Sequence, residues 1–380
     1  MEFGFSNEQH QFRAALKRFL DDHSSPAQVR RAMVSDQGFD RTVWRTACED
    51  LGVAGIRIPE HYGGAGFGYV ELGIALEEMG RALCCAPFFS STVMAVEVLL
   101  AAGVEQYREL LLPSIASGRA IATVAIAEAG GDWDPATVTM TADTSAAGVI
   151  LSGSKHFVPD GSAADVILVV AREPGSAGLE GLALYLADAD SDGLTREDLT
   201  MLDPTRRMAR LGFDHVRAER ISEPGGAGLA LSRALDHAAI ALANEMVGGC
   251  QVLLDAVVEY AKLRMQFGRV IGSFQAIKHK CADMLLDVEH AKSAAYRAAA
   301  SIDANDPQVT QFASLAKATA SDAYMRTAAE AIQIHGGIGF TWDHDTHLWF
   351  KRAKSSQVFL GSPDWHRERY LQAVEIEAVA

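Results

Sequence analysis

Residues 333–340 read QIHGGIGF, where an alanine-rich helical stretch gives way to a turn. Glycine has no Cβ, so paired glycines at a helix end let another backbone or a phosphate approach where a larger residue would collide. A plain helix C-cap accounts for the same pair, and a lone glycine motif is weak evidence for a ligand. The stretch alone leaves both interpretations open, and the rest of the chain has to separate them.

The composition indicates a globular protein with an acidic surplus. The chain has 380 residues, of which 49% are hydrophobic and 22% are charged, and its formal net charge is −15. This length supports two or three structural units with large cores. Because there is no basic surplus, nucleic acid is not an expected partner, and an anionic ligand must be held by local donors.

The N-terminus, the apolar runs and the cysteines favour a reduced compartment. The first residues, MEFGFSNEQHQF, lack the basic and then apolar pattern of a secretory signal. The longest apolar candidate, 229–260, is interrupted before it reaches the roughly 20 residues of a membrane span. The interrupting residues are Arg233, Asp236, Asn244, Glu245 and Asp255. Five cysteines without metal-ligand spacing complete the prediction of a cytoplasmic protein with no membrane span and no metal site.

Periodicity predicts three segments, beginning with a helical domain over 1–120. Ser6 is a plausible N-cap with Gln9 as its capping-box partner, and a turn-rich stretch at 55–69 separates two helical parts. Residues 121–228 contain short apolar segments bounded by turn residues, which predict a central antiparallel β-sheet or barrel. The predicted strands are 121–127, 149–151, 165–171, 182–187 and 213–221, with a hairpin-like loop at 173–181.

The third segment, 229–380, is predicted to be a C-terminal four-helix bundle. Apolar residues recur at steps of three and four along 235–260, which is typical of one face of a long helix. Further helices are predicted over 273–302, 308–334 and 363–376, with Asn305-Asp306-Pro307 as a break. The fold class is therefore α+β and multidomain.

This layout and three stretches resemble the acyl-CoA dehydrogenase family over nearly the whole chain. LRMQFGRVIGSFQAIKHKCADM (263–284) is similar to the family's R-x-x-F-G stretch with its later glutamine and A-D-M. QIHGGIGF (333–340) is similar to Q-x-x-G-G-x-G-F, and SGSKHFVPDGSAADVILVVAR (152–172) to a strand pair that normally contains I-T-N. The resemblance implies FAD as cofactor and an acyl-CoA thioester as substrate. It also implies a tetramer, with itself or with a related subunit, and an electron-transfer acceptor protein.

The resemblance also implies which residues hold the cofactor and the substrate. Arg264 has a forked guanidinium suited to pyrophosphate, although an arbitrary arginine is more often a surface ion pair. Asp236 matches an aspartate near the pantetheine arm of the thioester, and a solvated helix carboxylate is the alternative. The expected FAD contacts are Arg264, Phe267, Gln275, Gln333, Gly336, Gly337 and Ser362, some of them to the FAD of a neighbouring subunit.

The chain departs from the family where the catalytic base is expected. The segment FLGS (359–362) stands where most members have Y-E-G-T, so Leu360 takes the place of the glutamate. A second subset carries its glutamate on the long helix, at a place that falls on Ala238 here. Abstraction of an α-proton needs a base within about 3 Å. Glu245 shares a helical face with Ala238 but lies about 10 Å further along the axis, and it is the remaining candidate base.

One further departure concerns the flavin, and two glutamates elsewhere in the chain also bear on the prediction. Pro159 stands where the family's threonine is expected to hydrogen-bond the flavin edge, and proline has neither a hydroxyl nor an N–H. Glu128 keeps the place of a family glutamate after the first predicted strand. Glu97, on an apolar helical stretch, is either a polar floor to an acyl pocket or an ordinary salt-bridged residue.

Three hypotheses follow from this pattern. In the first, the chain is a subunit whose own base is missing and which completes the FAD site of a glutamate-bearing partner. The pattern that motivates it is that the residues expected to contact FAD across a subunit interface are kept, whereas those expected to do chemistry in the chain's own site are lost. In the second, it is a self-sufficient flavoenzyme with an unusual base or with flavin-dependent oxygenation. In the third, it is a non-catalytic binding protein that kept the fold.

Overall fold

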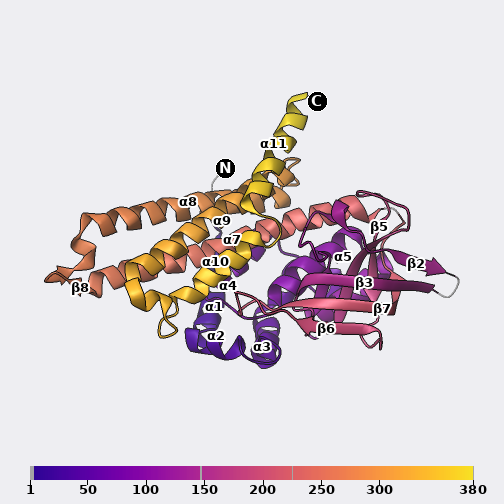
Figure 1. Cartoon of the computed structure of the whole chain (residues 1–380), viewed down its shortest axis with the longest axis horizontal. Coiled ribbons are helices and arrows are strands. Elements are labelled where there is room, and N and C mark those ends of the chain that lie inside the picture. The colour runs from indigo at the N-terminus through magenta and orange to yellow at the C-terminus, as the bar shows by residue number, and fades with distance from the viewer. Residues whose placement is uncertain (1–3, 146–147, 225, 380) are drawn as a thin grey trace. The chain divides into compact units, whose positions relative to one another are not determined.

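The computed structural model describes residues 4–145, 148–224 and 226–379, and Figure 1 shows the elements with the labels used below. The described residues gather into two compact units made of separate segments. The helical unit comprises the chain up to Arg30, Tyr69–Cys84 and the chain from Ala239 onward, and the sheet unit comprises Arg31–Gly68 and Cys85–Ala238. The predicted segments 1–120, 121–228 and 229–380 group the chain differently, and their boundaries remain a prediction.

The helical unit begins with α1 (Asn7–His23), which packs on α4 (Tyr69–Arg81). The predicted capping box is present: the Gln9 N–H donates to Ser6 Oγ at 3.2 Å, and the Ser6 N–H donates to Gln9 Oε1 at 2.8 Å. Arg13 on α1 donates to the carboxylates of Glu77 and Glu78 on α4, at 2.9 and 3.1 Å. A cap and a half-buried ion-pair cluster therefore fix the start of the chain.

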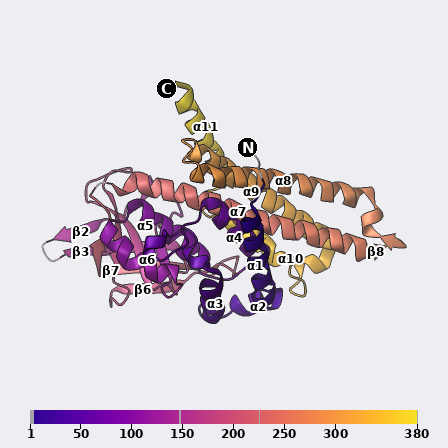
Figure 2. The same cartoon turned by 180° about the vertical axis from the view of Figure 1, so that it is seen from behind.

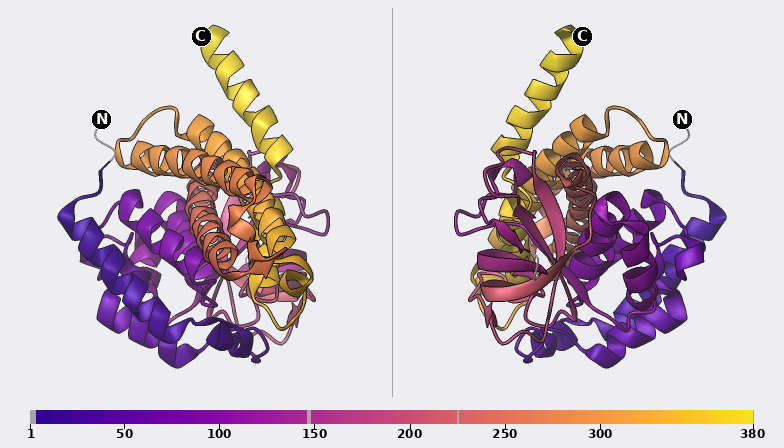
Figure 3. Two further views of the ribbon diagram at one scale, coloured as in Figure 1. Left: turned by 90° about the vertical axis from the view of Figure 1, so that its left-hand side faces the viewer. Right: turned by 90° about the vertical axis from the view of Figure 1, so that its right-hand side faces the viewer.

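Long helices make up the rest of this unit. They are α7 (Ala227–Leu263, whose first residues belong to the sheet unit), α8 (Gln275–Asp303), α9 (Val309–His335), α10 (Thr346–Val358) and α11 (Pro363–Val379). Helices α8 and α9 lie side by side, and α11 packs on α9 at its start and then extends beyond both (Figures 1 and 3). The backbones of α4 and α7 approach so closely that a Cβ at Gly248 would lie 1.8 Å from the Glu77 carbonyl oxygen.

Helix α7 alone, among the described helices, is long and apolar enough to cross a membrane by length and composition. However, 78% of its most apolar window is buried inside the protein, as in the core helix of a globular protein. The polar interruptions noted in the sequence are thus too widely spaced to break its apolar window, and burial accounts for the composition.

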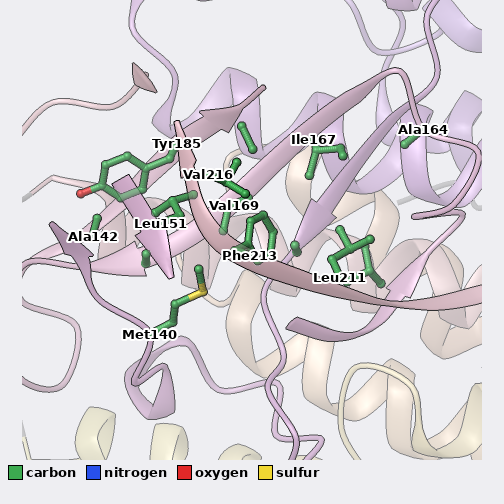
Figure 4. Close-up of a cluster of buried hydrophobic side chains, with 14 of the residues drawn as sticks. Met140, Ala142, Leu151, Ala164, Ile167, Val169, Tyr185, Leu211, Phe213 and Val216 are labelled. Atoms are coloured by element: carbon green, nitrogen blue, oxygen red, sulfur yellow. The ribbon is translucent and has the colours of Figure 1, made fainter. Parts of the chain in front are cut away.

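The sheet unit contains seven paired strands within the described ranges. They are β1 (Ala122–Ala125), β2 (Ala142–Ser145), β3 (Gly148–Pro159), β4 (Val166–Arg172), β5 (Leu182–Ala187), β6 (Leu194–Asp198) and β7 (Met208–Arg220). The order is β1-β4-β5-β7-β3-β2, and β6 also pairs with β7. Figure 4 shows buried side chains that the strands bring together, including Leu151, Val169, Tyr185, Leu211 and Phe213. Alternating apolar residues thus build the core of this unit.

Short helices complete the sheet unit, and Figure 2 shows them from behind. They are α3 (Arg41–Leu51), the π-helix η3 (Phe88–Ala95), α5 (Val96–Ala102) and α6 (Glu105–Ala116). Helix η3 is wholly buried and contacts β1. The 3-10 turns η1 (Val53–Gly55) and η2 (Glu60–Tyr62) form part of the predicted turn-rich stretch, and the chain passes from the helical to the sheet unit within α2 (Pro26–Ala32).

The predicted helical, β and helical layout is confirmed, with corrections in the sheet. All strand pairs were expected to be antiparallel, but β1 pairs with β4 in parallel, because the hairpin β2–β3 intervenes and the connection is long enough to return the chain in the same direction. Strands β2 and β6 and helix α10 were not predicted. The loop predicted at 173–181 is present, closed by the Glu173 N–H donating to the Gly181 carbonyl at 2.8 Å.

Candidate functional site

The segment after α7 folds into a small hairpin at one end of the helical unit (Figure 1). Strand β8 (Met265–Gln266) pairs with β9 (Arg269–Val270), and the two turn residues Phe267 and Gly268 have φ of 51° and 75°. Positive φ at both central residues matches the right-handed twist of a two-residue hairpin. The Phe267 side chain is 90% exposed. The hairpin thus holds a large apolar side chain out into solvent.

Arg264 stands at the base of this hairpin, where its N–H donates to the Tyr260 carbonyl at 2.9 Å. The residue is exposed and has no ion-pair partner among the residues the structure describes. Gln275 is also exposed and is the first residue of α8. The first N–H groups of a helix lack intrahelical partners and favour anions. A cation and a helix N-terminus therefore flank the hairpin.

The glycine turn follows α9 directly. Gly336 caps the helix, and its N–H bonds to the carbonyls of Gln333 and Ile332. Its φ of 70° and ψ of −151° lie in a region that is essentially restricted to glycine. Ideal Cβ atoms at Gly336 and Gly337 would meet no atom within 4 Å, and Gln333 is exposed. The turn is therefore a helix cap whose outer side is open, so both interpretations of the sequence motif remain compatible with it.

The hairpin and the glycine turn meet through Tyr260. Its ring packs on the His335 ring with centroids 4.4 Å apart, and its hydroxyl reaches the His335 carbonyl at 3.5 Å. This contact links the end of α7, from which Arg264 and the hairpin continue, to the end of α9, where the glycine turn begins. An unpaired guanidinium and an uncovered glycine backbone are each suited to a pyrophosphate.

The α10–α11 turn, residues 359–362, holds Leu360 in a left-handed conformation with φ of 58°. Leu360 is buried, with 3% of its surface exposed, and its side chain cannot accept a proton. Ser362 Oγ accepts the Trp365 N–H at 3.2 Å and thereby caps α11. The predicted FAD contact of Ser362 would have to share its hydroxyl with this cap.

The candidate positions on α7 are all buried. Asp236 is 3% exposed, Ala238 is 1% exposed and Glu245 is 6% exposed. Glu245 pairs with Arg352 on α10, with Nη1 and Oε1 2.8 Å apart. This ion pair accounts for the burial of the Glu245 carboxylate without a catalytic role, because an interior charge needs a partner.

Glu97 lies in the sheet unit between two cationic or titratable groups. Its carboxylate is 2.9 Å from His237 Nδ1 and 3.4 Å from Arg57 Nε, and the residue is 4% exposed. The sequence left two interpretations of Glu97, a polar floor to an acyl pocket or an ordinary salt-bridged residue. The salt bridge is present, but the residue is buried and not on the surface.

Glu128 and Lys155 form a second polar centre of the sheet unit. The Lys155 ammonium donates to Glu128 Oε1 and to the Ile126 carbonyl, both at 2.9 Å. Burial opposes ionisation of Glu128, but hydrogen bonds from Thr139, Met140 and Lys155 outweigh it and lower the Glu128 pKa to about 2. Burial lowers the pKa of Lys155 to about 8, against the attraction of Glu128. With so many donors, Glu128 anchors the loop after β1.

Pro159 ends β3 beside a register shift between Lys155 and Val158. Its carbonyl accepts the hydroxyl of Thr123 at 2.6 Å. The neighbouring Phe157 and Asp160 have φ of 53° and 50°. The strand end is thus tightly bent, and position 159 contributes only an acceptor.

Sequence reasoning missed Lys317, His366 and Arg352, which are 0%, 1% and 4% exposed. Lys317 lies in the alanine-rich run SLAKATA, and a lone lysine among small residues on a predicted helix was the available signal. In the described residues no group of three or more His, Cys, Asp or Glu side chains is placed to hold a metal ion.

Comparisons with known proteins cover nearly the whole length of the chain. Residues 6–119, 123–216 and 225–374 match the models "Acyl-CoA dehydrogenase, N-terminal domain", "middle domain" and "C-terminal domain". The chain is 35% identical to acyl-CoA dehydrogenase IpdE2 of Mycobacterium tuberculosis over 362 residues, which are 94% of each protein.

Two solved structures show the same fold. One is a variant of the "Tcur3481-Tcur3483 steroid ACAD", with a TM-score of 0.88, 30% identity and coverage of 98% of this chain and 99% of that one. The other is the ChsE4-ChsE5 complex of Mycobacterium tuberculosis, with a TM-score of 0.89, 26% identity and coverage of 99% of both chains.

These matches confirm the predicted cofactor, FAD, and the predicted reaction class. With three domain models matched in order and a 35% identical relative over 94% of its length, the chain belongs to the acyl-CoA dehydrogenase family, oxidoreductases that act on the CH–CH bond of an acyl-CoA.

Proposed function

We propose that the chain works in an acyl-CoA dehydrogenase assembly in which it has no catalytic base of its own and completes the FAD site of a related, glutamate-bearing partner. The observation that carries this proposal is the contrast between two regions of the helical unit. Leu360 is buried and apolar at the usual base position, whereas Phe267 is 90% exposed and Gly336 and Gly337 are uncovered.

Each open residue has a role in this proposal. The guanidinium of Arg264 pairs with a pyrophosphate oxygen, and the first N–H groups of α8 near Gln275 add a favourable dipole. The same cofactor can come close to the backbone at Gly336 and Gly337, because these residues have no side chain, and it can contact the amide of Gln333. When bound, FAD supplies the two-electron acceptor of the dehydrogenation. The proton acceptor is contributed by the partner, since neither Leu360 nor Ala238 can take a proton.

The relatives support a mixed assembly. Two of the similar structures, the Tcur3481-Tcur3483 steroid ACAD and the ChsE4-ChsE5 complex, are each named for two proteins. Large apolar side chains are also exposed on α8, α9 and α11 of this chain: Leu285, Leu286, Leu315 and Leu371 are 48%, 58%, 43% and 55% exposed. A pocket of about 390 Å³ lies among the same helices. Exposed apolar side chains of this kind are suited to a subunit contact.

We further propose a cytoplasmic location and a role in steroid or fatty-acid catabolism, with electrons passing to an acceptor protein.

Co-expression tests the partner role. We expect the chain purified alone to hold little FAD, and the chain purified with a glutamate-bearing homologue to hold FAD in a mixed tetramer. Arg264→Ala in this chain should lower the FAD content of the mixed tetramer, whereas Arg45→Ala, at an exposed i,i+4 ion pair, should not. FAD content unaffected by Arg264→Ala would count against the proposal.

The second candidate function is a self-sufficient flavoenzyme in which Glu245, a buried carboxylate on α7, is the base. If it were the base of a self-sufficient enzyme, Glu245→Gln would abolish flavin reduction by acyl-CoA while the protein stayed folded. The ion pair with Arg352 favours a structural role, since the carboxylate is already held at 2.8 Å. Oxygen consumption with reduced flavin, without bleaching by any thioester, would instead indicate oxygenation.

A further inference from the structure

The backbone of the α10–α11 turn is held by a buried lysine. Lys317 on α9 is 0% exposed, and its Nζ donates to the carbonyl of Gly361 at 2.7 Å and to that of Gln357 at 3.1 Å. A third bond, at 3.2 Å, goes to the hydroxyl of Ser321 one turn along the same helix. The ammonium thus spans the end of α10 and the turn that follows it, where helix carbonyls lack intrahelical partners.

A buried histidine holds the carbonyl between these two. His366 on α11 is 1% exposed, and its Nε2 is 2.8 Å from the Leu360 carbonyl. Burial and the nearby charge of Lys317 lower the pKa of His366 to about 3, so the ring is neutral at neutral pH. Because a carbonyl only accepts, Nε2 carries the proton. Its Nδ1 is buried and has no hydrogen-bond partner in the described part of the chain.

This arrangement is costly for a loop that only joins two helices. Burial lowers the pKa of Lys317 to about 7, and only Asp322 opposes that shift. Leu360 adopts a left-handed φ of 58°, which is uncommon for a residue with a Cβ. At Gly361, with φ of 100°, a Cβ would lie 2.6 Å from the Trp365 ring. Strained backbone persists only where its surroundings over-determine it.

We propose that Lys317 and His366 are positioning residues, which hold the carbonyls of Gln357, Leu360 and Gly361 so that the side chain at position 360 is presented in a fixed place, and that this support is intact although the side chain is a leucine. The chain would then lack a carboxylate at position 360 but keep the hydrogen bonds from Lys317 and His366 that would hold one in place. The second part rests on the proposed function.

Hydrogen exchange tests the positioning role without any cofactor. In Lys317→Met, we expect the amides of 358–362 to exchange about tenfold faster, while those of α8 keep their protection. Lys354→Met is the matched control, because Lys354 is exposed and its ammonium donates to the side chain of the same Gln357, at 2.8 Å. If Lys317→Met does not fold, Ser321→Ala removes one acceptor and should give a smaller change in the same segment. Unchanged exchange in 358–362, or a loss spread evenly over α9, α10 and α11, would overturn the proposal.

Leu360→Glu tests the second part in the FAD-loaded assembly, with the partner's own glutamate changed to glutamine. We expect Leu360→Glu to restore flavin reduction by acyl-CoA and Leu360→Gln not to do so. Adding Lys317→Met should slow the restored reduction about 100-fold, while acyl-CoA affinity changes little, because a misplaced base loses rate rather than binding. Equal rates with and without Lys317→Met, including no reduction in either, would overturn this part. The proposed function is judged separately, by the FAD content of the mixed tetramer.

Discussion

The hairpin–glycine region and the α10–α11 turn belong to the same helical unit, yet they are built in opposite ways. Around Phe267 and Gly336 the chain leaves an aromatic ring and glycine backbone uncovered. Around Leu360, buried Lys317 and His366 satisfy the turn carbonyls within the same chain. In the proposed function the first region is completed by another molecule, whereas the second is closed within the chain and carries a leucine at position 360. The proposal is thus that a family member keeps its binding surface and its backbone support while losing the chemistry of one side chain.

The buried ion pair of α7 and α10 should give the largest effect on stability. Arg352→Met removes the buried cation that pairs with the Glu245 carboxylate at 2.8 Å, so we expect a loss of about 3–5 kcal/mol in the free energy of unfolding. The double variant Glu245→Leu with Arg352→Met should recover most of that loss. Urea unfolding of the three proteins measures this. A single variant as stable as the parent would mean that the pair does not hold the carboxylate in place.

Substitutions at Gly336 and Gly337 in the hairpin–glycine region distinguish the effect of backbone strain from the effect of blocking the approach of a ligand. Gly336→Ala forces a Cβ into a conformation nearly restricted to glycine and should cost about 1–3 kcal/mol. Gly337 lies outside the left-handed region and has open space around it, so Gly337→Ala should leave the melting temperature unchanged. Both should lower FAD retention in the assembly. Normal FAD content in Gly337→Ala would show that the cofactor does not approach this turn.

The buried lysine that supports the α10–α11 turn should make the free energy of unfolding depend on pH. Lys317 has a folded pKa of about 7, below the ordinary lysine value, so the unfolded chain binds more protons above pH 7. Stability should therefore rise with pH between about 7 and 10, with a contribution of at most about 1.4 kcal/mol per pH unit from this residue. Denaturant unfolding across that range measures the slope. Lys354→Met should keep the slope and Lys317→Met should lose this contribution; equal slopes would argue against a buried ammonium.

Phe267 should have the smallest effect on the folded chain. Because its side chain is 90% exposed, Phe267→Ser should change the free energy of unfolding by less than about 0.5 kcal/mol. It should nevertheless reduce FAD content and assembly, as measured by absorbance and by sedimentation. Val34→Ser, at a side chain that is 74% exposed in the sheet unit, is the control and should alter neither. Unaltered assembly in Phe267→Ser would mean that the hairpin tip is not a contact.

Much of the fold could be predicted because it depends on local patterns. The capping box at Ser6, the period of α7 and the loop at 173–181 each follow from residues close together in sequence. The parallel pairing of β1 with β4 could not be predicted in this way, because it depends on how a long connection returns.

The candidate site was predicted unevenly for a similar reason. The hairpin and the glycine turn carry recognisable motifs, but their meeting through Tyr260 and His335 is a tertiary contact. Glu245 was singled out as a buried carboxylate, yet its partner Arg352 lies 107 residues further along the chain. Lys317 looks like any helical lysine until packing buries it.

The partner role is tested most directly by an anaerobic titration with a panel of acyl-CoA thioesters, in which the chain is purified alone and free FAD is supplied in the buffer. We expect the flavin to stay oxidised with every thioester and its absorbance to bleach only after the glutamate-bearing partner is added, because Leu360 and Ala238 cannot accept an α-proton. A stable yellow tetramer of this chain alone that bleaches on addition of an acyl-CoA would contradict it.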